Sequence, residues 1–408
     1  MVIGNIIIYS SIFFFLYISI LSLLVLWECK NRIYKPKLRK NHPNVCIIVP
    51  CFNEEKTIVK TVHSLLKLDY PRDRLEILVI DDGSSDKTLE RAKTLEKYTQ
   101  VKVFHKPNKG KYTALNYGLS KTKAEFVGCL DADSFVIPQA LGLIMPYFNN
   151  PKIMACTSSV KIHQAKGALQ RIQKIEYIFG IFLRKVFALL NSITVAPGPF
   201  TIFRKRAFDK LGPFRHGHNT EDLEIAFRIQ SKNYEIANAP NACVYTVGPS
   251  SFKKLFQQRK RWYSGLSRNA WDYRSLMFNR TYGDLGFFVF PSIFLSVLIF
   301  LFVSFYTIFQ FTQYAIHRFI AWQAVGFSLN QFVFRFDWFF INTQLYVLLS
   351  ILLFGMFFGI VLLGKKLSFT KSRTGKDFLF FVLFYSPLYF IWWLSAIQDI
   401  VFNKKNKW

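Results

Sequence analysis

The sequence predicts an α/β domain with a mostly parallel β-sheet, joined to transmembrane α-helices. Two observations lead to this fold class. Apolar strand-like segments alternate with helix-like segments from residue 44 to residue 130, and such alternation is typical of a parallel sheet that helices cover on both faces. Elsewhere, four uncharged apolar runs each reach the roughly 18 to 20 residues with which a helix crosses a bilayer.

The elements of the α/β part follow from their apolar patterns. Strands are expected at residues 44–50, 75–82, 101–105 and 125–130. Helices are expected at residues 55–68, 86–98 and 111–121, and the second helix is expected to be capped near Ser84 or Ser85. Ligands of such sheets bind at the carboxyl ends of the strands, so the residues that directly follow the strands are the candidates for a site.

The uncharged runs are residues 5–27, 285–315, 338–364 and 378–398. No basic residue precedes the first run and no small-residue cleavage site follows it, so we expect a retained anchor rather than a cleaved signal peptide. Six basic residues follow this anchor with no acidic residue among them: Lys30, Arg32, Lys35, Lys37, Arg39 and Lys40. The positive-inside rule therefore predicts an external N-terminus and a cytosolic segment between the first two runs.

A shorter apolar stretch, residues 319–334, is either a further span or a re-entrant or interfacial element. Counting it as a span would place Lys365, Lys366, Lys371, Arg373 and Lys376 outside the membrane and bring only Lys404, Lys405 and Lys407 inside. Charge therefore favours four spans with an external C-terminus. The predicted location is the plasma membrane, with several spans and with the α/β domain in the cytoplasm.

The chain carries 53 basic and 25 acidic residues, a formal net charge of +28. Such an excess has two ordinary explanations, a nucleic-acid partner or an anionic membrane surface. Beside four apolar runs the membrane surface is favoured, so the lipid bilayer is an expected partner and nucleic acid is not. The six cysteines occur singly, without a CxxC pair or metal-ligand spacing with histidine, which indicates reduced cytosolic thiols.

Three of the four predicted strands end in candidate site residues. The first strand runs into Pro50, Asn53 and Glu54, the second ends on Asp81 and Asp82, and the fourth ends on Asp131 and Asp133. Because the carboxyl ends of parallel strands meet at one edge of the sheet, these residues are expected to lie together. The first turn reads PCFNEE rather than GxGxxG, which argues against NAD or FAD. Asp81 or Asp82 can instead accept hydrogen bonds from a base N–H or a ribose hydroxyl.

Asp131 and Asp133 stand one residue apart at the end of a buried strand. Two carboxylates this close repel each other, and without a cation one of them tends to take up a proton. A divalent cation, Mg²⁺ or Mn²⁺, is therefore the expected cofactor, held by both carboxylates and bridging the oxygens of a diphosphate. Lys109 and Lys111, at a helix start, can add positive charge near that diphosphate. The alternative for a single DxD motif is a solvated turn.

Two later motifs supply candidate catalytic groups. A predicted helix carries Glu221 and Asp222 in its first turn, where the helix dipole favours ionised acids. A carboxylate there is either part of an ordinary helix cap or the general base toward an acceptor hydroxyl. Gln258, Arg261 and Trp262 have the i, i+3, i+4 spacing of one helix face, so they line either a site or a helix that lies on the membrane.

Six motifs occur in a fixed order: VPCFNEE, DDGSSD, NKGKYTALN, DADS, NTEDLE and QxxRW. Over roughly residues 44–265 this order resembles the processive family 2 glycosyltransferases, the synthases of cellulose, chitin, hyaluronan and poly-N-acetylglucosamine. The segment APGPFTIFRKRAF, which contains Gly198, is most similar to the acceptor loop of bacterial poly-N-acetylglucosamine synthases. The resemblance implies a GT-A type nucleotide-sugar-binding fold, a UDP-sugar donor, a growing glycan acceptor and a magnesium or manganese ion.

The resemblance also implies roles for individual residues. A carboxylate that matches Asp222 deprotonates the acceptor hydroxyl for in-line attack, with inversion at the anomeric carbon. Arg261 stabilises the departing UDP, and Trp262 stacks under the acceptor sugar at the entrance of a channel. The amphipathic stretch at residues 169–190 is either an interfacial helix beside that entrance or part of the core.

The expected domains are an N-terminal transmembrane anchor (residues 1–29), a cytosolic GT-A glycosyltransferase domain (30–250), interfacial helices with QxxRW (251–284) and a C-terminal transmembrane region (285–408). The expected function is polymerisation of a UDP-sugar, with UDP-N-acetylglucosamine as first choice, into a β-linked polysaccharide that crosses the membrane. Transfer of one sugar to a lipid acceptor is the alternative, and a non-catalytic scaffold or exporter component is the third reading. Four spans are few for a wide conduit, so either the polymer passes a narrow bundle or an accessory membrane subunit assists.

Overall fold

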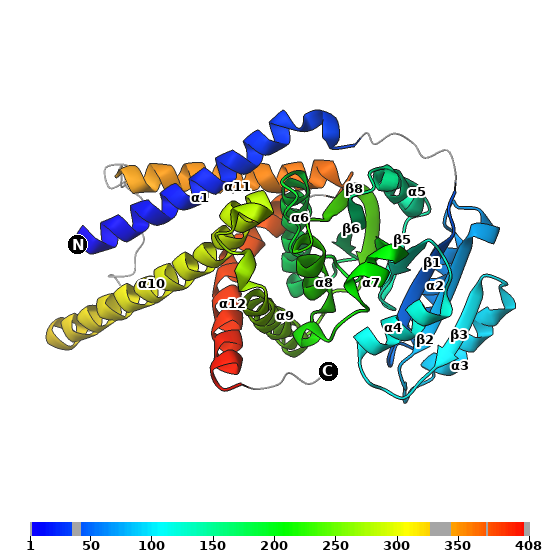
Figure 1. The fold of residues 1–408 in the computed structure, drawn as a ribbon. Helices are drawn as coiled ribbons and strands as arrows, with labels where there is room; N and C mark the ends of the chain where they lie inside the picture. Colours follow the sequence, from blue (N-terminus) through cyan, green and yellow to red (C-terminus); the bar gives the residue numbers. More distant parts are fainter. Residues whose placement is uncertain (1, 35–41, 327–343, 373, 404–408) are drawn as a thin grey trace. The chain divides into compact units, whose positions relative to one another are not determined.

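The computed structural model describes residues 2–34, 42–326, 344–372 and 374–403. The chain divides into two compact units. The helical unit comprises Met1–Leu24 and Pro291–Gly359, and the sheet unit comprises Val25–Phe290 and Ile360–Trp408. All β-strands of the described residues belong to the sheet unit (Figure 1).

The described part of the sheet unit is built on one eight-stranded sheet of order β3-β2-β1-β4-β7-β6-β8-β5. Its strands are β1 (Val45–Cys51), β2 (Leu75–Asp81), β3 (Val101–His105), β4 (Phe126–Cys129), β5 (Ser134–Val136), β6 (Ile153–Ile162), β7 (Thr201–Arg204) and β8 (Glu235–Thr246). β1 is parallel to β2 and β4, β2 to β3, and β6 to β8, whereas β7 is antiparallel to β4 and β6, and β5 to β8. The predicted α/β fold with a mostly parallel sheet is confirmed.

Helices cover both faces of this sheet. α2 (Ile58–Leu66), α3 (Thr88–Lys93) and α5 (Ala140–Ile144) pack on one face, and α4 (Lys111–Lys121), α7 (Lys205–Leu211) and α8 (Glu221–Gln230) pack on the other. Successive residues of β1 alternate between the two cores: Ile47 and Val49 belong to the first, and Cys46 and Ile48 to the second. β1 therefore reads as a continuous apolar run, because a strand with both faces covered has no solvent-facing side.

The start of α3 differs from its prediction. Ser84 or Ser85 was expected to cap this helix, and that expectation is wrong. Asp86 Oδ1 accepts the hydrogen bond from the backbone N–H of Thr88 at 2.9 Å. Ser85 instead donates its backbone N–H to Asn53 Oδ1 at 2.9 Å. The two serines are engaged by the neighbouring turn, and Asp86 accepts the first backbone N–H of the helix instead, while the N-cap residue Lys87 makes no side-chain cap.

Three long helices pack together within the sheet unit (Figure 1). They are α6 (Ala168–Leu189), α9 (Phe252–Asp272) and α12 (Gly375–Val401). The apolar side of α6, predicted from residues 169–190, packs against β6, β8 and α12, and its residues Ile175, Ile178, Phe182 and Val186 are buried. This stretch was expected to be either an interfacial helix or part of the core, and its apolar face is part of the core.

The helical unit is formed by most of α1 (Val2–Glu28), by α10 (Phe290–Val325) and by most of α11 (Leu345–Leu367). Among the described residues, four helices are long and apolar enough to cross a membrane: Gly4–Glu28, Leu285–Ala324, Leu345–Leu367 and Gly375–Val401. Their number matches the four predicted runs. The first part of the ambiguous stretch 319–334 continues α10 to Val325, and residues 327–334 lie outside the described residues.

Candidate active site

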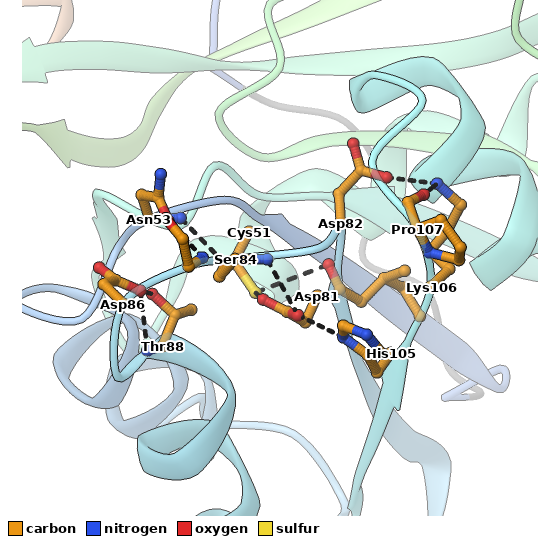
Figure 2. A network of polar contacts seen from close by, with 12 residues as sticks. Cys51, Asn53, Asp81, Asp82, Ser84, Asp86, Thr88, His105, Lys106 and Pro107 are labelled. Carbon is orange, nitrogen blue, oxygen red and sulfur yellow. Dashed lines mark hydrogen bonds and ion pairs between the residues drawn. The ribbon is translucent and has the colours of Figure 1, made fainter.

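Asp81, at the end of β2, is a buried carboxylate with its oxygens already occupied. Its Oδ2 lies 2.7 Å from His105 Nδ1 and accepts a hydrogen bond from the backbone N–H of Ser84 at 3.3 Å (Figure 2). The side chain of Asp81 is fully buried, whereas that of His105 is 51% exposed. His105, which was not among the predicted site residues, is therefore the member of this pair that solvent reaches.

Asp82 ties the end of β2 to the loop that precedes α4. Its Oδ1 is paired with Lys106 Nζ (Figure 2), and its Oδ2 accepts the backbone N–H of Gly110 at 2.9 Å. The backbone N–H of Lys109 also donates to Oδ1 at 3.3 Å, while the Lys109 side chain is exposed. Gly110 has a φ of 95°, a conformation that favours glycine. Asp82 thus shapes the NKGK loop.

The turn after β1 is joined to the turn after β2. Asn53 has a left-handed φ of 56° and donates its backbone N–H to Ser84 Oγ at 3.0 Å. Glu54 donates its backbone N–H to Thr88 Oγ1 at 2.7 Å. Pro50 is buried within β1. Three of the predicted substrate contacts therefore belong to a strand end and turn that are held in place by the neighbouring strand's turn.

Lys111, the first residue of α4, joins two carboxylates from distant parts of the chain. Its Nζ lies 2.8 Å from Asp131 Oδ1 and 3.0 Å from Glu221 Oε1. Burial disfavours the ammonium, but the two carboxylates outweigh burial and raise the pKa of Lys111. Burial likewise opposes ionisation of Glu221, yet Lys111 outweighs it and lowers the pKa of Glu221. Lys111, for which a diphosphate was predicted as partner, is thus paired with acids in this structure.

The loop ahead of β7 approaches this cluster through Gly198. A Cβ at this position would lie 2.6 Å from Lys111 Nζ and 2.8 Å from Asp131 Oδ1, closer than such atoms approach. The backbone N–H of Phe200 donates to the carbonyl of Cys129 at 2.7 Å and anchors the loop to β4. The predicted acceptor loop therefore lies beside Asp131, and a side chain at position 198 would require the ends of Lys111 and Asp131 to move.

Asp131 and Asp133 flank a turn after β4. Burial raises the pKa of Asp133 to about 7, and the negative charges of Asp131 and Glu54 add to this effect. Asp133 Oδ1 accepts hydrogen bonds from Ser134 Oγ at 3.0 Å and from Thr246 Oγ1 at 3.3 Å. Among the described residues, no group of three or more His, Cys, Asp or Glu side chains is arranged to hold a metal ion. A divalent cation nevertheless fits the two carboxylates, because it would relieve their repulsion and take its other ligands from water or a diphosphate.

Asp222 lies in the first turn of α8. Burial and the neighbouring Glu221 raise the pKa of Asp222 to about 6, whereas Lys111 and Arg261 favour its ionised form. The Thr220 hydroxyl does not cap the helix but donates to a backbone carbonyl at 2.7 Å. A carboxyl group that titrates near neutral pH beside two cations is suited to take a proton from a hydroxyl.

Two residues outside the predicted set, Gly265 and Asn269, hold α9 against the start of α8. Asn269 Nδ2 donates to the carbonyl of Gly217 at 2.8 Å and to Thr220 Oγ1 at 2.9 Å. A Cβ on Gly265 would lie 2.4 Å from Thr220 Oγ1. Both follow Arg261 at steps of four residues, so the helical spacing from QxxRW was a signal that could have found them.

Arg259, also outside the predicted set, is fully buried between three helices. Its Nη2 lies 2.6 Å from Glu176 Oε2 and its Nη1 donates to Gln258 Oε1 at 3.0 Å. Its guanidinium carbon lies 4.1 Å from the ring centroid of Trp262, a cation–π contact. Gln258 and Trp262 are thus structural partners of Arg259. The sequence signal that could have found Arg259 was its position three residues before Trp262.

α6 contributes a polar side to the same region. Burial raises the pKa of Tyr177 to about 12, and the Asp133 carboxylate acts in the same direction. Burial lowers the pKa of Arg184 to about 10, while Asp222 favours its charged form. A Cβ added to Gly180, which lies between them on this side of α6, would meet no atom within 4 Å. No motif marks these residues, so only the fold could reveal them.

The structure therefore divides the predicted site residues into two sets. Electrostatic and close contacts bring together Lys111, Asp131, Asp133, Gly198, Glu221, Asp222 and Arg261. Hydrogen bonds gather Asn53, Asp81, Asp82 and Lys109 with the ends of β1 to β3. Glu54 links the sets through its charge effect on Asp133. Gln258 and Trp262 lie beside Arg259.

Residues 46–212 match glycosyl transferase family 2, and this stretch runs from β1 through α7. It contains the turns after β1 and β2, the NKGK loop, the DADS motif and Gly198. The matched stretch lies within the sheet unit of this chain.

The chain is similar to poly-beta-1,6-N-acetyl-D-glucosamine synthases of staphylococci. It is 34% identical over 235 residues to the synthase of Staphylococcus epidermidis, which covers 56% of this chain and 56% of that protein. It is 32% identical over 224 residues to the synthase of Staphylococcus aureus strain COL, which covers 54% of each. The chain thus spans about half the length of the curated relatives it matches.

The fold as a whole is shared with mannosyltransferase PcManGT from Pyrobaculum calidifontis, solved in complex with GDP-Man and Mn²⁺. The TM-score is 0.58 at 17% sequence identity, over 97% of this chain and 99% of that one. The predicted GT-A type fold with additional membrane-length helices is thereby confirmed. At this identity the likeness concerns the fold alone.

Proposed function

We propose that this protein is a membrane-embedded inverting glycosyltransferase that polymerises a UDP-sugar, with UDP-N-acetylglucosamine as first candidate, into a β-linked polysaccharide. The observation that carries the proposal is the cluster of Lys111, Asp131, Glu221 and Asp222. Its members come from three separate motifs, and those of Lys111 and Asp131 lie in the stretch that matches glycosyl transferase family 2. The similarity to poly-beta-1,6-N-acetyl-D-glucosamine synthases supports the choice of sugar.

The donor binds across the carboxyl ends of β1, β2 and β4 in this proposal. Asn53 and Asp82 support the nucleoside side, where the turns are already joined by hydrogen bonds. Asp131 and Asp133 hold Mg²⁺ or Mn²⁺, which supplies positive charge to the diphosphate when bound. The exposed Lys109 side chain adds to that charge.

Asp222 acts as the general base. Its carboxylate takes the proton from an acceptor hydroxyl while the hydroxyl oxygen forms a bond to the anomeric carbon. The bond from that carbon to the diphosphate breaks, UDP leaves with the electron pair, and the anomeric configuration inverts. Arg261, whose charge already favours ionised Asp222, stabilises the charge that develops on the leaving group. A positioned base of this kind contributes about 10²- to 10⁴-fold in rate.

The proposed location is the plasma membrane with the sheet unit in the cytoplasm, where UDP-sugars are available to it. The basic segment after α1 supports this orientation, and four helices have the length and hydropathy of spans. The growing glycan is the second substrate and passes across the membrane, either through the narrow bundle or with the help of an accessory subunit.

The test offers radiolabelled UDP-sugars one at a time to the purified protein in detergent and measures the size of the product. A long product from one donor, absent with Asp222→Asn, is the expected result. A single sugar on a lipid would support the alternative transferase instead. No transfer from any UDP-sugar, by a protein that remains folded, would leave only the scaffold interpretation.

A further inference from the structure

α12 is one of the four helices with the length and hydropathy of a span, yet it packs on α6 and α9 of the sheet unit, to which it also belongs (Figure 1). Near its start, Asp377 Oδ2 lies 2.7 Å from Lys174 Nζ of α6. Near its end, Asp399 Oδ1 lies 2.8 Å from Lys260 Nζ of α9. Both ends of α12 are therefore tied by ion pairs to helices of the same unit.

The middle of α12 packs on the same two helices. The Tyr385 hydroxyl donates to Glu176 Oε1 of α6 at 3.2 Å. The Trp393 ring is stacked on Tyr263 of α9 with centroids 4.8 Å apart. Trp392 is also buried on this side. One face of α12 is thus docked on α6 and α9 from its first turn to its last.

These contacts conflict with a crossing of the membrane. At about 1.5 Å per residue, Asp377 and Asp399 are about 33 Å apart along the helix, close to the roughly 30 Å thickness of the hydrocarbon core. If α12 crossed that core, Lys174 and Lys260 would lie at opposite membrane surfaces. α6 and α9 would then have to extend through the lipid beside it.

α6 and α9 are too charged for that position. α6 carries Arg171, Lys174, Glu176, Arg184 and Lys185, and α9 carries Lys253, Lys254, Arg259, Lys260, Arg261, Arg268 and Asp272. Ionisable residues are rare and costly inside membranes. α6 also follows β6 directly, and α9 follows β8, so both begin at the sheet.

The face of α12 that points away from α6 and α9 is exposed and apolar. It includes Leu379, Leu383, Ile391, Leu394 and Ile397, with Leu379 56% and Leu383 60% exposed. These residues are spread over the whole helix. A helix with one docked face and one apolar exposed face is suited to lie in the plane of a membrane surface rather than to cross it.

The end of α11 places this face at the membrane. A Cβ on Gly364, in the last turn of α11, would lie 2.4 Å from the carbonyl oxygen of Ile178 in α6. The carbonyl of Ser368 accepts a hydrogen bond from Lys161 Nζ of β6 at 2.5 Å. The candidate span α11 therefore ends on α6, and residues 368–374 lead directly from there into α12.

We propose that α12 lies flat in the membrane interface, with its exposed apolar face in the lipid of the leaflet that borders the sheet unit. The chain then has three spans, α1, α10 and α11, and its C-terminus is on the same side as the sheet unit. This reverses the external C-terminus predicted from four spans. It also places Lys365, Lys366, Lys371 and Lys376 on the same side as Lys404, Lys405 and Lys407, which agrees with the positive-inside rule.

The first test compares the sides of single cysteines in inside-out and right-side-out vesicles with a membrane-impermeant maleimide. The background is Cys29→Ser, because the other five native cysteines are buried. We expect Asn403→Cys to be labelled in the same vesicles as Lys97→Cys of the sheet unit, and Gln323→Cys near the end of α10 in the opposite vesicles. Labelling of Asn403→Cys together with Gln323→Cys would overturn the proposal.

This test compares positions within one chain, so its result does not depend on whether the proposed function is correct. If Lys97→Cys were labelled from outside, the cytoplasmic location would fail, while agreement between Asn403→Cys and Lys97→Cys would still support the flat helix. Sugar transfer is not part of the readout.

The second test measures membrane depth with nitroxide labels at Leu379, Leu383, Leu394 and Ile397, using oxygen and nickel accessibility. A helix in the membrane plane gives similar shallow depths at all four positions. Leu379 and Ile397 are about 27 Å apart along the helix, so a spanning helix would place them near opposite surfaces. A label at Ile391 that is much deeper than labels at both ends would contradict the proposal.

Discussion

Two groups of carboxylates lie at the same edge of the sheet and differ in how their charge is met. Asp81 and Asp82, after β2, are joined to His105, to Lys106 and to backbone N–H groups. Asp133 and Asp222 are half-buried beside other acids, and their pKa values are raised to about 7 and about 6. The first group is complete without a ligand, whereas burial and neighbouring acids oppose ionisation in the second group, which added positive charge from a ligand would favour.

This difference separates residues that build the site from residues that react in it. A paired carboxylate holds loops together, so its loss should lower stability. A buried carboxylate that repels its neighbours costs stability and is retained where catalysis needs it. Substitutions in the first group should therefore mainly lower stability, whereas substitutions in the second should mainly lower activity.

The largest effect is expected for Asp222→Asn. Transfer should fall by about 10²- to 10⁴-fold, because the amide cannot take the acceptor proton. The folded-state pKa of about 6 lies above the ordinary value of 3.8. This carboxyl group therefore lowers the unfolding free energy of the protein as the pH rises through about 6. At pH 7.5 the variant, which lacks the carboxyl group, should melt at the same temperature as the wild type or higher. Product formation and thermal unfolding are measured together.

The matched control for Asp222→Asn is Asp209→Asn, an exposed aspartate on α7. It should change neither property. A variant at Asp222 that keeps wild-type transfer, or that melts well below the wild type, would assign this residue to the structural group.

The second prediction concerns the cation. Excess EDTA should reduce transfer to background, and Mg²⁺ or Mn²⁺ should restore it, because Asp131 and Asp133 are proposed to hold the diphosphate through that ion. Adding Mn²⁺ without donor should also raise the melting temperature, since it relieves the repulsion between Asp131 and Asp133. Full activity in excess chelator would indicate that the DADS motif is only a polar turn.

The sequence predicted β1 to β4 well, because these strands depend on local apolar patterns, whereas β5 to β8 were not predicted. β3 and α4 have the predicted bounds, and the acids fall at strand and helix ends. Contacts between motifs were not predictable: Lys111 pairs with Glu221, 110 positions later in the chain, and no local pattern encodes that contact. The serines do not cap α3 because the neighbouring turn binds them, and Asp86 accepts the backbone N–H of Thr88 instead.

Hydropathy was least informative for α12. Composition measures how apolar a segment is, but it does not show which charged residues meet its ends. Asp377 and Asp399 read as flanks of a span in the sequence, whereas in the fold they are partners of Lys174 and Lys260. Partner identity is a tertiary property, and it decides between a span and an interfacial helix.

The third prediction tests the completed group through Asp82→Asn. The change leaves the largely buried ammonium of Lys106 without its carboxylate partner, which typically costs about 1–3 kcal/mol of unfolding free energy. The NKGK loop should loosen, so the KM for the donor rises more than kcat falls. Asp73→Asn is the control, because the Asp73 side chain is 76% exposed in its ion pair. Equal unfolding curves for Asp82→Asn and wild type would show that Asp82 does not belong with the carboxylates that stabilise the fold.

The fourth prediction is a pH profile. A base with a pKa of about 6 is mostly ionised at pH 7 and about one-tenth ionised at pH 5, so the rate at saturating donor should fall about tenfold between these values. UDP release is followed from pH 5 to pH 8, with donor binding measured in parallel. A rate that stays level down to pH 5, with donor binding unchanged, would argue against Asp222 as the base.

The smallest effect on rate and the clearest on product is expected for Trp262→Ala. If the indole supports the acceptor by stacking, its loss leaves donor binding and UDP release largely intact, while chains leave early and products shorten. The variant also removes the contact with Arg259, which is worth about 0.5–2 kcal/mol, so a modest loss of stability is expected in either case. Trp271→Ala on the same helix, where the side chain is exposed, should alter neither. Product length therefore decides: shortened chains make Trp262 part of the acceptor site, whereas lower stability with full-length chains makes it only the partner of a buried arginine.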